Sequence, residues 1–114
     1  MRVIMDLEKI KNFIEFKKDY DYIANMQWKF NYVSGYRNMI VLLDPGKEEY
    51  NIAGIVNEIK KIGYELKDVN NYNDLYNELT STLSLINSQV NEYMAKKLFD
   101  KITEKTVRSM FNIR

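Results

Sequence analysis

The chain has 114 residues and a formal net charge of +1, and it contains neither Cys nor His. This length fits one domain, so we expect residues 1–114 to form a single unit. Without Cys there is no disulfide or thiolate chemistry, and without His the commonest general base and neutral metal ligand are missing. No paired-carboxylate motif or phosphate-binding glycine loop replaces them. The sequence therefore predicts a protein that is not an enzyme and that uses no cofactor or metal.

Composition also bears on location and origin. No apolar stretch approaches the roughly 18 residues of a membrane span, and the N-terminus lacks a signal-peptide core, so we expect a cytoplasmic protein without membrane contact. Asn (13), Lys (13), Ile (12) and Tyr (9) together make 47 of the 114 residues. This bias is typical of an AT-rich gene, and it favours a phage or mobile element of a low-GC host.

The first predicted elements are a short strand and a helix. Residues 1–5 are interpreted as the strand, and Asp6 is placed to cap a helix that runs to about Asp19. Three apolar side chains share one face of this helix, namely Leu7, Ile10 and Ile14.

Residues 22–44 predict a β-hairpin. Apolar residues alternate with polar ones along residues 26–32, which is the period of a strand with one buried face. If Ser34 and Gly35 form the loop, Trp28 lies opposite Val41 on an apolar face. We therefore expect Trp28 in the core rather than stacked on RNA bases. The second strand, 39–43, is apolar on both faces and needs a second cover.

A second helix and a further strand follow Pro45–Gly46. The helix is indicated by isoleucines and a valine at helical spacing and by Gly63 as its stop. Its apolar residues are Ile52, Ile55, Val56, Ile59 and Ile62. Residues 64–69 are interpreted as a strand. The order of elements over residues 1–69 predicts an α+β fold, a ferredoxin-like βαββαβ sandwich.

Residues 73–112 predict a C-terminal helical extension with two apolar stripes. One stripe contains Leu75, Leu79, Leu83, Ile86, Val90 and Met94. The other contains Leu98, Phe99, Ile102, Met110 and Ile113, and it points roughly 140° away on a helical wheel. One straight helix cannot turn both stripes to the same surface. Either the helix breaks near residues 93–96, or its second half packs on a partner.

The second stripe leads to the functional prediction. An exposed apolar patch of this size usually marks an interface, so we expect a homodimer that depends on Leu98, Phe99, Ile102, Met110 and Ile113. We interpret the chain as a small non-catalytic regulatory protein that binds another protein, for example an inhibitor or modulator of a host protein.

Two alternatives belong to other functional classes. Lys97, Lys101, Lys105 and Arg108 share a helical face and could contact the phosphates of a nucleic acid. Asp100 and Glu104 are spaced to pair with these cations within the helix, which favours a solvated face instead. A metal-dependent nuclease built around Asp6 is the weakest hypothesis, because a lone Asp before a helix is far more often a cap.

Overall fold

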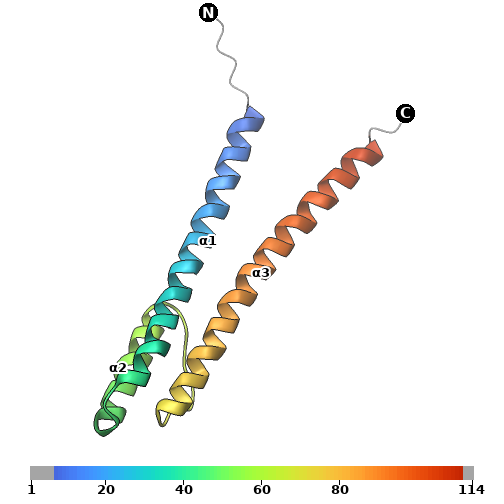
Figure 1. Ribbon diagram of the computed structural model, residues 1–114. Helices are drawn as coiled ribbons and strands as arrows, with labels where there is room; N and C mark the ends of the chain where they lie inside the picture. The colour runs from blue at the N-terminus through green and yellow to red at the C-terminus, as the bar shows by residue number, and fades with distance from the viewer. Residues whose placement is uncertain (1–6, 112–114) are drawn as a thin grey trace, which may run out of the picture.

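The computed structural model describes the backbone of residues 7–111 and the side chains of residues 7–104, and this part of the chain contains helices and no strand (Figure 1). The long helices are α1 (Leu7–Met39) and α3 (Tyr72–Phe111), which have 33 and 40 residues. Between them lie two 3-10 turns, η1 (Ile40–Leu42) and η2 (Pro45–Lys47), and the helix α2 (Glu48–Lys61). The protein is an all-helical hairpin.

The hairpin is closed at one end and open at the other. Helices α1 and α3 run side by side near their connection, where α2 packs beside them, and they diverge toward the two chain termini (Figure 1). The molecule is accordingly elongated, with extents of 74 × 37 × 18 Å. We call residues 7–20 the α1 arm and residues 94–111 the α3 arm, and the remainder is the closed end.

The hydrophobic core lies in the closed end. Helix α1 contributes Met26 and Val33, and Ile40 of η1 follows them at the same seven-residue spacing, so the three lie on one side of this helical segment. Helix α3 contributes Leu75, Leu79, Leu83 and Ile86, and α2 contributes Ile52, Ile55 and Ile59. Burial of these side chains drives the helices together.

Local sequence signals fix the bounds of α2. The side chain of Asp44 accepts a hydrogen bond of 2.9 Å from the Gly46 amide, and Pro45 occupies the first position of η2. Acidic residues lie in the first turn of α2 and lysines in its last turn, as the helix dipole favours. Gly63 follows with a φ of 101°, which ends the helix in a left-handed conformation. The predicted second helix and its stop are therefore confirmed.

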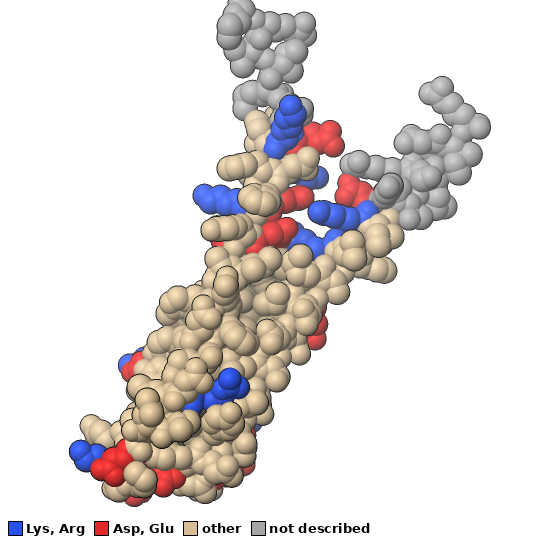
Figure 2. Space-filling model, viewed as in Figure 1, with Lys and Arg blue, Asp and Glu red and all other residues tan. Residues whose placement is uncertain are grey.

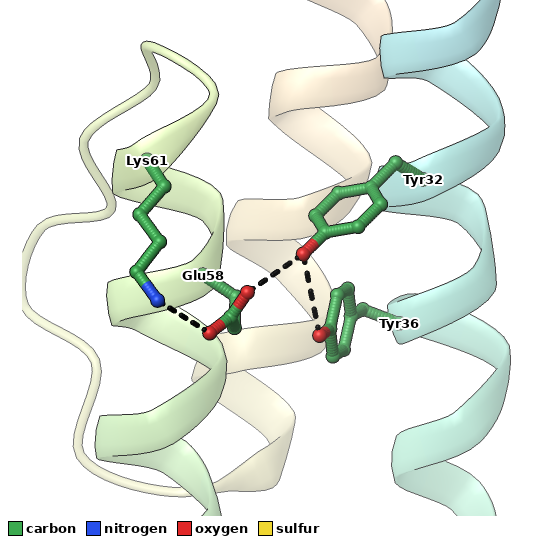
Figure 3. Close-up of polar contacts among 4 residues, drawn as sticks. All are labelled: Tyr32, Tyr36, Glu58 and Lys61. Atoms are coloured by element: carbon green, nitrogen blue, oxygen red, sulfur yellow. Dashed lines mark hydrogen bonds and ion pairs between the residues drawn. The ribbon is translucent and has the colours of Figure 1, made fainter.

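A polar cluster ties α2 to α1 (Figure 3). The Tyr32 hydroxyl donates a hydrogen bond of 2.8 Å to Glu58 Oε2, and it lies 3.4 Å from the Tyr36 hydroxyl. Lys61 Nζ donates to Glu58 Oε1 at 2.9 Å. The neighbouring Lys61 and the Tyr32 hydroxyl lower the pKa of Glu58, whereas hydrogen bonds with Tyr36 and Glu58 raise the pKa of Tyr32. These contacts orient α2 along the side of the hairpin.

The ferredoxin-like prediction was wrong. Residues 22–39, predicted as a β-hairpin, continue α1, and Gly35 lies inside this helix with open space around its α-carbon. Trp28 is 54% exposed rather than buried, because it lies on the side of α1 that points away from the core formed by Met26 and Val33. The alternation of residues 26–32 also fits a helix, whose buried positions recur every three or four residues.

One further prediction was wrong, because residues 64–69 form a loop and not a strand, in which Tyr64 is buried. Of the two alternatives for the last helix, the break near residues 93–96 does not occur, because α3 is continuous from Tyr72 to Phe111. The predicted strand over residues 1–5 and the Asp6 cap lie outside the described residues.

Candidate protein-binding surface

A polar contact marks the point where α1 and α3 begin to separate. Lys97 Nζ lies 3.2 Å from Asp19 Oδ1, and the Tyr93 hydroxyl donates a hydrogen bond to the same carboxylate. The ring of Tyr22 stacks on the ring of Tyr93 with 4.1 Å between their centroids. We call Asp19, Tyr93 and Lys97 the clasp, because they join α1 to α3 at the base of the two arms.

The members of the clasp shift one another's pKa values. The hydrogen bond from Tyr93, followed by that from Lys97, lowers the pKa of Asp19. The Asp19 carboxylate raises the pKa of Tyr93 and of Lys97. At neutral pH the clasp therefore holds a carboxylate, a neutral phenol and an ammonium group, which is its fully bonded state.

Beyond the clasp, the arms enclose a charged cleft. Two adjoining cavities of about 740 and 460 Å³ lie between them. Their walls carry carboxylates and lysines from both helices, and Figure 2 shows blue and red side chains meeting in this gap. The acidic residues are Glu8, Glu15, Asp19, Asp100 and Glu104, and the lysines are Lys11, Lys97 and Lys101. The cleft is therefore lined mostly by polar residues, with Leu7 and Phe16 as its apolar ones.

Large apolar side chains are exposed on both arms. On the α1 arm Phe13, Phe16 and Tyr20 are 66%, 67% and 63% exposed, and the rings of Phe16 and Tyr20 stack with 6.4 Å between their centroids. Leu7, Ile10 and Ile14 are exposed on the same arm, and Leu7 and Phe16 also border the cleft. The α3 arm exposes Leu98, Phe99 and Ile102. In contrast to the closed end, the facing sides of the arms are therefore mostly charged, and large apolar residues are open to solvent.

Three of the five predicted interface residues have side chains that the structure describes. Leu98, Phe99 and Ile102 are exposed on the α3 arm, away from the cleft, as the two-stripe pattern indicates. The side chain of Met110 and all of Ile113 lie outside the described residues. The aromatic patch of the α1 arm was not predicted from the sequence, although Phe13, Phe16 and Tyr20 have the spacing of residues on one side of a helix.

Two of the four basic residues proposed for nucleic-acid binding have described side chains, and these two do not form an isolated basic patch. Lys97 and Lys101 line the cleft opposite the carboxylates of Glu15 and Asp19, and Lys97 is paired with Asp19. The side chains of Lys105 and Arg108 lie outside the described residues.

Two further kinds of feature, a metal-binding cluster and a membrane-spanning helix, are absent from the described residues. Among residues 7–104 no three Asp or Glu side chains are grouped so that they could hold a metal ion. Nor does the described part of the chain contain a helix whose length and apolar character would let it span a membrane. Asp6, the candidate metal ligand, lies outside the described residues.

Comparison of the chain with models of protein families, with curated proteins and with solved structures found no match in any of the three.

Proposed function

We propose that this chain is a non-catalytic protein-binding protein, and that the aromatic patch on the α1 arm holds the partner. The observation that supports the proposal is the exposure of three large aromatic side chains in this patch. Large apolar side chains normally turn inward in a small helical protein, and contiguous exposed ones mark interaction sites. Phe13, Phe16 and Tyr20 form such a patch at the free end of the hairpin, where no other described helix covers them.

The spacing of this patch favours a helical partner. Phe13, Phe16 and Tyr20 follow one another at three and four residues, so they form a ridge along α1. A ridge of this kind packs into the groove of an amphipathic helix. Lys17 lies beside the ridge, four residues after Phe13 and three before Tyr20, and favours an acidic residue at the rim of the partner.

Protein binding is preferred to nucleic-acid binding for an electrostatic reason. The cleft wall carries five carboxylates and three lysines, so its formal charge is −2. A phosphate backbone is repelled by such a surface and attracted only by net positive charge. A protein that contacts the aromatic patch of the α1 arm through apolar side chains meets no such electrostatic repulsion.

The test is a pull-down from a low-GC bacterial lysate at physiological salt, read by mass spectrometry, with the intact chain and two matched variants. Phe13→Ser/Phe16→Ser removes the ridge. Leu42→Ser/Tyr50→Ser removes two side chains that are at least as exposed, 86% and 83%, but lie at the closed end. We expect a protein that is retained by the intact chain and by the closed-end variant but lost with the ridge variant. Equal retention by both variants would show that the arm is not the binding site.

A further inference from the structure

The outward side of α3 lacks charge over an unusual length. Residues 79–95 contain one charged residue, Glu92. Nevertheless, Ser84, Asn87 and Asn91 in this segment are exposed. A helix face in contact with water normally carries Lys, Glu or Arg. An exposed face without them is suited to contact with another protein.

Seven residues define this face, which we call the α3 seam: Thr80, Ser84, Asn87, Asn91, Ala95, Leu98 and Ile102. They fall within about 80° of one another on a helical wheel. Their spacing is 4, 3, 4, 4, 3 and 4 residues, which reads the same in both directions from Asn91. The buried residues Leu79 and Ile86, which face α1, lie on the other side of the helix. Within the hairpin Thr80 is half-buried and the other six residues of the seam are exposed, with Asn87 and Asn91 at the border of a groove between α3 and α1.

The two halves of the α3 seam, before and after Asn91, differ in side-chain size. The half before Asn91 carries the small residues Thr80 and Ser84, and the half after it carries the large apolar residues Leu98 and Ile102, which are 61% and 56% exposed. If two seams run antiparallel with Asn91 at the centre, Leu98 of one lies opposite Ser84 of the other. Ile102 then lies opposite Thr80 by the same two-fold symmetry.

We propose that the α3 seam binds a second copy of this chain, in an antiparallel α3–α3 contact with its two-fold axis at Asn91. Each large side chain then packs over a small one, which lets the two helices approach closely. No charged residue belongs to the seam, so the contact buries no unpaired charge. A parallel pairing places Leu98 against Leu98 and Ser84 against Ser84, so two large side chains meet at one level and two small ones leave a gap at another.

Asn91 gives the pairing its register. Its amide group both donates and accepts hydrogen bonds, so two copies of Asn91 can bond to each other across the axis. A shift by one turn in one direction places Asn91 against Ala95 and leaves its amide without a partner across the contact. A shift in the other direction places Asn91 against Asn87 but moves Ile102 from the small Thr80 to the bulky Tyr76. Single buried asparagines fix the register of helix pairs in this way.

This inference goes beyond the proposed function because it concerns a different surface. The aromatic ridge of the α1 arm takes no part in the seam. Loss of the dimer and loss of the partner protein can therefore be observed independently.

The absence of Cys from the chain makes disulfide trapping a clean test. Under mild oxidation we expect Asn91→Cys to give a cross-linked dimer on its own, because facing residues at the axis meet the short Cα separation that a disulfide needs. Ser84→Cys and Leu98→Cys should each cross-link poorly alone and well when the two chains are mixed. Tyr50→Cys, an exposed position on α2, is the control and should not cross-link.

Sedimentation of the unmodified chain at tens of micromolar completes the experiment, and we expect the mass of a dimer. The proposal fails if the chain sediments as a monomer. It also fails if Ser84→Cys alone cross-links as well as the mixture does, since that result indicates a parallel pairing. Circular dichroism of each variant verifies that the helices are retained.

Discussion

The closed and open ends of the hairpin use the same two helices in opposite ways. In the closed end Met26 and Val33 of α1 face the side of α3 that carries Leu79 and Ile86, and all four are buried. In the open end the corresponding sides of the helices line the charged cleft. Burial of an apolar side chain contributes about 1.5–3 kcal/mol, whereas an exposed ion pair contributes about 0–1 kcal/mol. The facing residues thus determine where the helices stay together and where they separate.

The clasp lies between the apolar contacts of the closed end and the charged cleft of the open end. Tyr93 takes part in both kinds of contact, because its ring stacks on Tyr22 and its hydroxyl donates a hydrogen bond to Asp19. From this comparison we infer that the two ends of the hairpin have different roles. The closed end supplies the stability of the fold, and the arms supply surface for other proteins.

The largest expected effect separates the two ends by stability. Leu79 is fully buried, so Leu79→Ala should lower the free energy of unfolding by about 2–5 kcal/mol through lost burial and the cavity that remains. Leu98→Ala, the same change on the exposed α3 arm, should lower the stability of the monomer by no more than about 0.5 kcal/mol. Urea denaturation at low protein concentration measures both. Similar losses for the two variants would contradict the division.

An intermediate effect is expected at Trp28, which lies in the closed end but on its outer side. Its ring stacks on Tyr32 with 5.2 Å between centroids, so Trp28→Ala should destabilise the fold by about 1 kcal/mol, less than the loss of a core aromatic. Acrylamide should quench the fluorescence of this single tryptophan readily, because half of the side chain is exposed. A strongly shielded indole would place it in a core or an interface.

A pH effect is expected at the clasp. The folded-state pKa of Asp19 is lowered, so its contribution is present above the ordinary Asp pKa and is lost as the pH falls through the lowered value. In acid the carboxylate becomes neutral, the ion pair with Lys97 is lost, and the arms should separate further. Spin labels on Phe13→Cys and Phe99→Cys should report a longer or broader distance distribution in acid.

The matched control for the pH effect is Asp19→Asn in the same labelled chain. It cannot form the ion pair at any pH, so it should give the broad distribution at neutral pH as well. A narrow distribution in this variant would show that the clasp does not hold the arms.

The smallest effect is expected for nucleic acid. Because Lys97 and Lys101 face carboxylates, binding to labelled DNA or RNA at physiological salt should be no tighter than about 10⁻⁴–10⁻⁶ M, the nonspecific range. Replacing Lys97, Lys101 and Lys105 together with Gln should change it little. Submicromolar binding that falls steeply with salt and disappears in the triple variant would favour a nucleic-acid regulator instead. Fluorescence anisotropy at two salt concentrations distinguishes these outcomes.

The sequence carried strong local signals for some elements and ambiguous ones for others. Helix α2 could be predicted because its isoleucines have a helical spacing and Gly63 ends it. Residues 26–32 could not be assigned locally, since their apolar side chains satisfy the period of a strand and that of a helix. What selects the helix is the seven-residue spacing of Met26, Val33 and Ile40 along the side that meets α3, and this match is tertiary. Gly35 in mid-helix added a false turn signal.

Of the candidate surface, the part on the α3 arm could be predicted from the sequence and the part on the α1 arm could not. The two stripes of α3 differ in direction, and this alone indicates that Leu98 and Ile102 point away from the core. The α1 arm gave no such contrast, because its exposed ridge was read as part of a helix packed on a sheet. Only the divergence of α1 from α3 shows that Phe13 and Phe16 are uncovered.

The division between the two ends is tested most directly by hydrogen exchange of the backbone amides at two protein concentrations. At low concentration the closed-end amides around Val33, Ile59 and Leu79 should exchange slowest, and those of both arms should exchange much faster. At high concentration residues 80–102 should gain protection as the α3 seam is covered, while residues 8–20 of the α1 arm should not. Equal protection of the arms and the closed end at low concentration, or protection of the α1 arm alone at high concentration, would contradict the account.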